Sequence, residues 1–184
     1  MMNRKDFFKN ICKYSVCGCT GMMLISPVNL LANDDDPEEK EEDWRIGFIQ
    51  NRIAKFIEGM NSELDKETLT ALLENMGKSC AKENVEGYVK FKGDLSGYLK
   101  SIEKWVEKIE HDEEKGIVKI IGKKNNSCFC PFVDISKMPK EFCNCTKGWN
   151  KETYETIIGK QVDVKIDSTV LWGGERCGFT ITYK

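Results

Sequence analysis

Two closely spaced cysteine pairs are the residues of this sequence best suited to chemistry. They are Cys128-Phe129-Cys130 and Cys143-Asn144-Cys145, separated only by residues 131–142. In an extended backbone, side chains two residues apart point to the same side, so each pair can offer two sulfurs to one centre. Four thiolates are the ligand set of a closed tetrahedral zinc site. The sequence therefore predicts zinc at these four cysteines, with an iron–sulfur cluster, which uses the same ligands, as the alternative.

Two further cysteines outside the N-terminal segment extend this prediction. Cys177 alternates with Phe179 and Ile181, which places it on the core-facing side of a predicted last strand. It can be a fifth thiolate of the metal site, the disulfide partner of Cys80, or a small buried apolar residue. We include Cys177 among the metal ligands and expect Cys80 to be structural. The same cysteines also fit structural disulfides in an oxidising compartment, and unpaired thiols are the remaining alternative.

The other residues give weaker signals of activity. The single histidine, His111, lies in a charged stretch that we expect to end a helix, where an exposed side chain fits better than a ligand or a base. The sequence contains no glycine-rich phosphate loop and no paired-carboxylate motif. Its formal net charge of −2 at pH 7 is unfavourable for wrapping nucleic acid, which requires basic surfaces. We therefore assign no catalytic residue and expect no nucleic-acid partner.

The N-terminal segment has the features of an export signal. Residues 1–32 begin with a basic stretch and continue as a weakly apolar one. The start resembles the twin-arginine export motif, with Arg4-Lys5 in place of two arginines. We expect an exported protein, periplasmic or anchored to the membrane only through this segment, with an acidic linker at residues 33–43. A lipoprotein with its lipid on Cys19 and a cytoplasmic protein with an N-terminal helix are the alternatives.

The periodicity of apolar residues predicts a single α+β domain over residues 44–184. Apolar stripes at helical spacing, expected to face the core, indicate helices from Trp44 to Met60, from Asp65 to Gly77 and from an N-cap at Asp94 to Ile109. A further helix is expected over residues 151–158, ended by Gly159, and strands over residues 117–121, 162–166 and 177–183. We therefore predict N-terminal helices packed on a small antiparallel sheet that ends in a C-terminal hairpin.

The order of short motifs along the chain resembles that of a known family. The motifs are Gly77-Lys78-Ser79-Cys80-Ala81, Cys128-Phe129-Cys130-Pro131, Phe142-Cys143-Asn144-Cys145-Thr146-Lys147-Gly148-Trp149, a short helix with Tyr154 and Glu155, Gly159, Ser168 in an alternating strand, Gly173-Gly174, and Cys177-Gly178-Phe179-Thr180-Ile181. On these residues the chain resembles the L-2-amino-thiazoline-4-carboxylic acid hydrolase-like family. It is also similar to the related four-vinyl-reductase-type small-molecule-binding domain. The similarity covers residues 44–184 and is strongest over residues 128–181.

The resemblance implies an α+β fold with a pocket for a small, often apolar molecule. In some four-vinyl-reductase-type domains, cysteines and a glutamate near the C-terminal strands hold zinc, and Cys143 or Cys145 together with Cys177 would match two of those ligands. The resulting hypothesis is an exported bacterial domain that binds a metal and a small-molecule ligand. One alternative is a hydrolase of the thiazoline-carboxylate type, using a cysteine or a metal-bound water. The other is a disulfide-stabilised domain that binds a partner.

Overall fold

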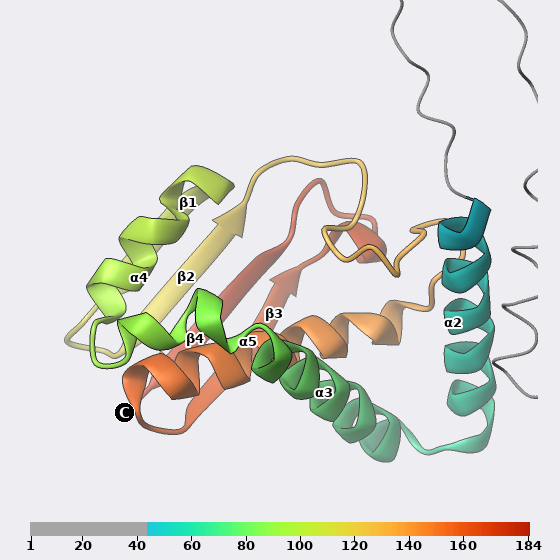
Figure 1. The fold of residues 1–184 in the computed structure, drawn as a ribbon, viewed down its shortest axis with the longest axis horizontal. Helices are drawn as coiled ribbons and strands as arrows, with labels where there is room; N and C mark the ends of the chain where they lie inside the picture. Colours follow the sequence, from blue (N-terminus) through green and yellow to red (C-terminus); the bar gives the residue numbers. More distant parts are fainter. Residues whose placement is uncertain (1–43) are drawn as a thin grey trace, which may run out of the picture. The chain divides into compact units, whose positions relative to one another are not determined.

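The computed structural model describes residues 44–184, and these residues form an α+β fold as predicted. Their helices and strands follow in the order α2 Trp44–Glu63, α3 Lys66–Glu83, α4 Leu95–Ile102, β1 Val106–Asp112, β2 Ile117–Gly122, α5 Cys143–Ile158, β3 Val162–Ser168 and β4 Gly178–Tyr183 (Figure 1). The predicted export segment and acidic linker, residues 1–32 and 33–43, lie outside the described residues and stay predictions.

The four strands form one antiparallel sheet in the order β1-β2-β4-β3. β3 pairs with β4, with Val164 opposite Ile181, so the predicted C-terminal hairpin is confirmed. Side chains alternate between the two faces of a strand, and this alternation turns Val118, Val164 and Ile181 toward the helices, where all three are buried. One face of the sheet is therefore part of the core.

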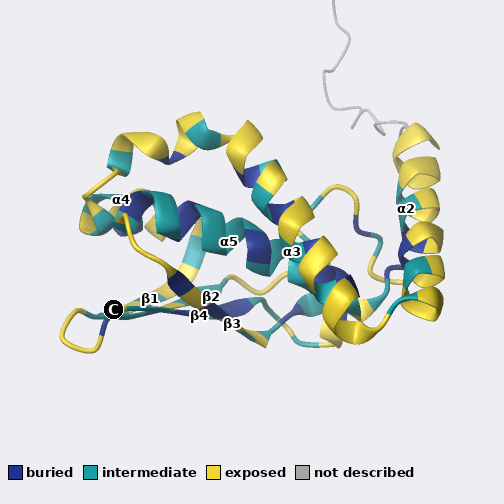
Figure 2. Ribbon diagram, turned by 90° about the horizontal axis from the view of Figure 1, so that it is seen from below, coloured by how far each residue is buried: buried dark blue, intermediate teal, exposed yellow. Residues whose placement is uncertain are grey.

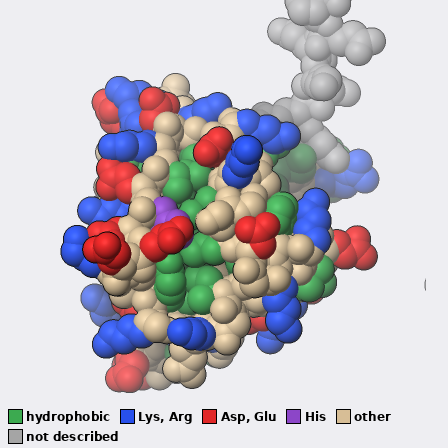
Figure 3. All heavy atoms as spheres, turned by 90° about the vertical axis from the view of Figure 1, so that its left-hand side faces the viewer, with side chains coloured by type: hydrophobic (Ala, Val, Ile, Leu, Met, Phe, Trp, Pro, Cys, Tyr) green, Lys and Arg blue, Asp and Glu red, His purple; other side chains and the backbone are tan. Residues whose placement is uncertain are grey.

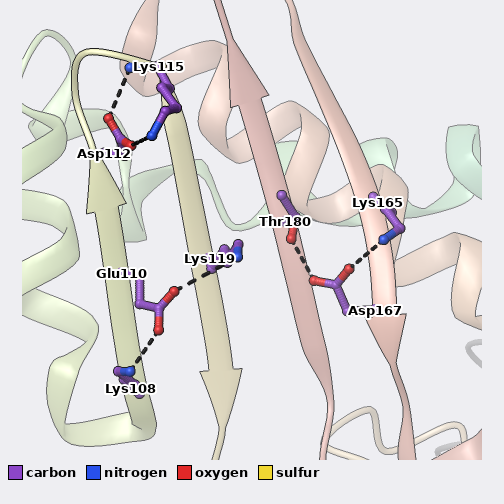
Figure 4. Close-up of polar contacts among 8 residues, drawn as sticks. All are labelled: Lys108, Glu110, Asp112, Lys115, Lys119, Lys165, Asp167 and Thr180. Carbon is purple, nitrogen blue, oxygen red and sulfur yellow. Dashed lines mark hydrogen bonds and ion pairs between the residues drawn. The ribbon is translucent and has the colours of Figure 1, made fainter.

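The other face of the sheet carries polar side chains (Figure 4). Glu110 on β1 lies 2.7 Å from Lys108 and 4.0 Å from Lys119 on β2. The Thr180 hydroxyl on β4 donates to the Asp167 carboxylate on β3 at 2.6 Å. Exposed ion pairs of this kind contribute little to stability because water screens them. This face is a solvated surface, and the groups with unusual chemistry lie elsewhere.

Helices α3, α4 and α5 lie over the apolar face of the sheet (Figure 2). Tyr154 of α5 and Leu99 of α4 are buried against the strands in one apolar core. A second core joins α2 and α3 to the segment that leads into α5, and the buried side chain of Cys143 belongs to it. Burial of apolar surface in these two cores is the main stabilising contribution to the fold.

Helices α3 and α5 extend well beyond their predicted limits, and α2 ends only slightly later than predicted, at Glu63. α3 continues through Gly77 to Glu83, and α5 begins at Cys143 rather than at residue 151. Glycine is locally a signal for the end of a helix, but Gly77 is buried where α3 meets α5. A Cβ at this position would overlap the backbone of Cys145. The prediction of a helix end at Gly77 is wrong because this glycine serves the close approach of two helices.

The predicted third helix is shorter, and a strand follows it. As predicted, Asp94 is the N-cap of α4, and its carboxylate accepts a hydrogen bond from the Gly97 amide at 2.8 Å. The helix ends at Ile102, whereas Val106 and Ile109 lie in β1. Their spacing fits a helix, but pairing with β2 overrides this local pattern. The predicted helix over this stretch is therefore wrong beyond Ile102.

Helix α2 begins at Trp44 as predicted but buries a narrower face than its apolar stripe suggests. Ala54 and Ile57 are buried, whereas the side chains of Ile46 and Phe56 are 48% and 66% exposed. The reason is that α2 packs on α3 and the segment before α5 along one side only. Among residues 44–184, no helix combines the length and the apolarity needed to cross a membrane.

Candidate functional site

Six cysteines of residues 44–184 come together from four parts of the fold, and none of them forms a disulfide. Cys80 lies on α3, Cys128 and Cys130 in the loop between β2 and α5, Cys143 and Cys145 in the first turn of α5, and Cys177 directly before β4. A charge on any of the five cysteines other than Cys145 would raise the pKa of another of the six, and Cys145 is itself among the thiols affected, so the six are neighbours in space. We call these six residues the cysteine cluster.

Helices α3 and α5 cross at two glycines, and this crossing positions Cys80 and Cys145. A Cβ on Gly77 would overlap the carbonyl oxygen of Cys145, and a Cβ on Gly148 would overlap that of Glu74. The two helix backbones therefore touch. Because residues three apart share a helix face, Cys80 follows Gly77 toward α5, and Cys145 precedes Gly148 toward α3. The glycine crossing thus brings two thiols from distant parts of the sequence together.

The loop between β2 and α5 turns Cys128 and Cys130 to the same side, as their spacing predicts. The intervening Phe129 is 94% exposed, while both cysteines are half-buried and pack against the core of α2 and α3. The side-chain amide of Gln50 on α2 donates to the carbonyl oxygen of Pro131 at 2.8 Å. This hydrogen bond holds the loop against α2 next to the first cysteine pair.

Cys143 and Cys145 do not share one side, because they lie in a helix. Successive helical residues turn by about 100°, so a spacing of two places their side chains nearly opposite each other. The assumption of an extended backbone is therefore wrong for this pair. The Cys143 thiol is buried and donates to the Thr169 hydroxyl at 3.2 Å. That hydroxyl also accepts from the backbone amide of Trp172, which fixes its position.

Burial and mutual repulsion raise the pKa of four thiols in the cysteine cluster. Burial, followed by charge on neighbouring thiols, raises the pKa of Cys145 to about 12. Burial is also the main reason that the pKa of Cys143 is raised to about 11. The pKa values of Cys130 and Cys177 are raised as well, first by burial and then by Cys128. These thiols are therefore protonated at neutral pH.

This electrostatic environment differs from that of a nucleophilic cysteine. Catalytic thiols have a lowered pKa because a lysine, an arginine, a protonated histidine or a helix N-terminus favours the thiolate. Cys143 and Cys145 lie in the first turn of α5, but burial raises their pKa values nonetheless. No cationic side chain of residues 44–184 lowers any of the four raised pKa values; hydrogen bonds are the only influences that oppose the increase. A bound divalent metal would lower these pKa values instead, because a thiol that coordinates a metal loses its proton. The raised pKa values therefore do not favour a nucleophilic thiolate.

The raised pKa values predict that the metal-free protein loses stability at alkaline pH. A cysteine thiol in the unfolded chain has a pKa of about 8.5. In the folded protein the pKa is raised to about 11 for Cys143 and to about 12 for Cys145. These two thiols contribute fully to the free energy of unfolding below about pH 8.5. This contribution is lost as the pH rises toward the pKa values of the thiols in the folded protein. Urea denaturation between about pH 8 and 10 should show a smaller loss in Cys145→Ser than in the wild type. An identical pH dependence in both proteins would contradict this assignment.

The thiols are neighbours but do not converge on a single point. Within the described part of the chain, no three or more Cys, His, Asp or Glu side chains are placed to hold a metal ion. The predicted ligands Cys128, Cys130, Cys143, Cys145 and Cys177 thus lie in one region without a closed coordination shell.

Cys80 is a member of the cluster that sequence reasoning missed as a candidate site residue. We expected it to be structural, yet it lies beside Cys130 and Cys145. The feature of the sequence that could have placed Cys80 in the cluster is its spacing of three residues from Gly77 within a helical stretch. That spacing has meaning only once Gly77 is known to touch α5.

His111 belongs to a different part of the fold and is also placed differently from the prediction. It lies in β1, not at a helix end, and its side chain is only 16% exposed. Its Nε2 atom lies 2.7 Å from the hydroxyl oxygen of Tyr183 at the end of β4, whereas Cys177 precedes the start of β4. The expectation of an exposed histidine is wrong because strand pairing turns His111 to the inner face of the sheet.

Comparisons with known proteins identify one family and a distant structural likeness. A family model described as a family of unknown function, DUF6144, matches residues 30–184. No curated protein matches the chain. Among solved structures, it is similar to a trafficking protein particle complex subunit 3 from Naegleria fowleri, covalently bound to palmitic acid, with 12% identity and a TM-score of 0.45 over 75% of this chain and 96% of that one. The resemblance to thiazoline-carboxylate hydrolases stays a prediction.

Proposed function

This chain belongs to the DUF6144 family of unknown function, and we propose that its described domain binds a zinc ion through the cysteine cluster. The observation that carries the proposal is the gathering of six free cysteines from four separate segments of the fold. Thiols so close together repel one another when ionised, and a soft divalent cation relieves this repulsion. The Cys-x-Cys pair of Cys128 and Cys130, both half-buried beside the exposed Phe129, supports the same conclusion.

Cys128 and Cys145 are the central ligands of the proposed site. A charge on Cys128 would raise the pKa of Cys130, Cys143, Cys145 and Cys177. The thiols that would raise the pKa of Cys145 are Cys130, Cys80, Cys128 and Cys143. Cys177 is the peripheral member, because among the raised pKa values it affects only that of Cys143, whereas Cys80 affects those of both Cys130 and Cys145. We propose that Cys128, Cys130 and Cys145 supply three thiolates of a tetrahedral site. The fourth is Cys80 or, if the first turn of α5 unwinds, Cys143, and an iron–sulfur cluster would use the same ligands.

Export of the domain and a small-molecule ligand are further parts of this proposal. They are supported by the signal-like residues 1–32 and by the resemblance described above, which implies a pocket between helices and sheet. A hydrolase with a cysteine nucleophile is disfavoured by the raised thiol pKa values, since a nucleophile needs its thiolate form. A disulfide-stabilised domain that binds a partner is the remaining alternative.

Elemental analysis of the full chain, purified without chelator and without air, tests the zinc proposal. We expect about one zinc ion per chain. Cys128→Ser and Cys145→Ser should each lose this zinc, because a serine hydroxyl is not a thiolate ligand. The matched control is Cys12→Ser, which makes the same chemical change in the N-terminal segment and should retain the zinc.

Circular dichroism establishes which variants are folded before their zinc contents are compared. An unchanged zinc content in folded Cys145→Ser would remove this residue from the ligand set and contradict the proposed site. Several iron atoms per chain would assign an iron–sulfur cluster in place of zinc. A protein without metal and without free thiols would establish the disulfide alternative.

A further inference from the structure

We infer that a pocket beside His111 and Tyr183 binds a small primary amine with an apolar tail. The pocket has a volume of about 440 Å³, within the range of roughly 300–1,000 Å³ that is usual for small-molecule sites. It lies where the start of α4, the end of α5, β1 and the end of β4 meet. The inference rests on the small-molecule part of the proposed function and does not depend on the metal.

Backbone hydrogen bonds hold the walls of this pocket in place. The Gly93 amide donates to the carbonyl oxygen of Ile157 at 2.7 Å, which ties the start of α4 to the end of α5. The Tyr183 amide donates to the carbonyl oxygen of Gly116 at 2.8 Å, which ties the end of β4 to the turn between β1 and β2. The pocket is therefore built on fixed elements and needs no rearrangement to form.

A histidine–tyrosine pair supplies a hydrogen-bond acceptor to the pocket. When the imidazole proton is on Nδ1, it faces the Glu113 carboxylate, which lies 3.8 Å away, and Nε2 accepts the hydroxyl proton of Tyr183 at 2.7 Å. The lone pairs of the Tyr183 oxygen are then available to a ligand. Burial and the carboxylates of Glu113 and Asp112 raise the pKa of Tyr183, so the phenol keeps its proton.

The remaining lining combines negative charge with an apolar floor. Leu95 and Ile158 supply apolar surface, and Asp94 and Glu113 supply carboxylates. Among the described residues that line the pocket there is no lysine or arginine. Figure 3 shows this side of the molecule, with apolar side chains gathered at its centre, the single histidine at their edge and acidic side chains beside it.

These features match an alkylammonium ion better than a neutral or anionic ligand. The ammonium group has three donors for the carboxylate and tyrosine oxygens, and its charge opposes theirs. The alkyl chain would cover the apolar floor and remove it from water. A carboxylate or phosphate ligand would instead be repelled by Asp94 and Glu113.

Nuclear magnetic resonance of the full chain with hexylamine tests this inference. His111 is the only histidine, so its ring signals report on the pocket without interference from another residue. We expect saturable shifts of these signals with hexylamine, weaker binding of hexanol and no binding of hexanoate. Glu113→Gln should weaken hexylamine binding about threefold, as expected for an exposed ion pair. Tyr183→Phe should weaken it about fivefold through the lost acceptor.

The matched control is Glu114→Gln, which makes the same charge change at an exposed neighbour that does not line the pocket. Its hexylamine affinity should equal that of the wild type. Equal binding of hexanol and hexylamine, binding of hexanoate, or the absence of a saturable shift would overturn the inference. Protein freed of zinc by a chelator should bind hexylamine unchanged, so failure of the amine site and failure of the metal site are separate results.

Discussion

Replacing Gly148 with alanine is expected to lower the free energy of unfolding by about 2–3 kcal/mol through overpacking. In an exposed helix the same change is stabilising, because alanine loses less backbone entropy on folding than glycine. At Gly148 a Cβ would overlap the backbone carbonyl of Glu74, and a rigid backbone cannot move aside like a flexible side chain. At this helix crossing, a Gly→Ala substitution that would normally stabilise a helix is therefore expected to destabilise the protein.

A matched control exists within the same chain. Gly59 lies inside α2, and a Cβ there would meet nothing within 4 Å. Gly59→Ala should therefore raise the free energy of unfolding by about 0.5–1 kcal/mol, the ordinary helical preference for alanine. Urea denaturation of the wild type and both variants measures the difference. If Gly148→Ala matched Gly59→Ala, the two helix backbones would not touch as described.

The helix crossing also connects stability to the proposed site. Gly148 lies three residues after Cys145, and Gly77 three residues before Cys80, so separating the helices would separate these thiols. We therefore expect Gly148→Ala to weaken zinc binding without removing any cysteine. Gly59→Ala should leave the zinc content unchanged, because it lies on α2 with open space around it.

Zinc affinity is expected to fall steeply as the pH is lowered from 8 to 6. A metal-bound thiolate must release its proton, and each released proton contributes up to about a tenfold change in affinity per pH unit. The pKa values of Cys143 and Cys145, about 11 and about 12, keep these thiols protonated in the metal-free protein throughout this range. With four thiol ligands, the affinity should therefore fall by up to about 10,000-fold for each pH unit that the pH is lowered.

Competition with a zinc indicator at several pH values measures this dependence. Cys145→Ser removes one releasable proton, so any zinc that remains bound should show a slope smaller by about one. Cys12→Ser is again the control and should keep the wild-type slope. An affinity independent of pH would mean that zinc binding releases no thiol protons and would contradict the proposed site.

Local patterns in the sequence were enough to predict much of the architecture. The strand over residues 162–166, the N-cap at Asp94 and the helix end at Gly159 depend on neighbours within a few residues, and all are present in the structure. The α+β class and the C-terminal hairpin follow from such elements. The alternation at Cys128-Phe129-Cys130 was also predictable, since both cysteines are half-buried and the residue between them is exposed, although the backbone bends there.

Only the tertiary structure decided the features that depend on segments far apart in the chain. Gly77 reads locally as a helix end, but its contact with α5 makes it a helix-crossing residue that places Cys80 in the cluster. Likewise, pairing with β2 turned an apparent helix end into β1 and moved His111 from an expected exposed position to the side of Tyr183. The sequence by itself determined which residues have reactive side chains and most local conformations. Which of those side chains meet depends on long-range packing and strand pairing, for which a single sequence carries no local signal.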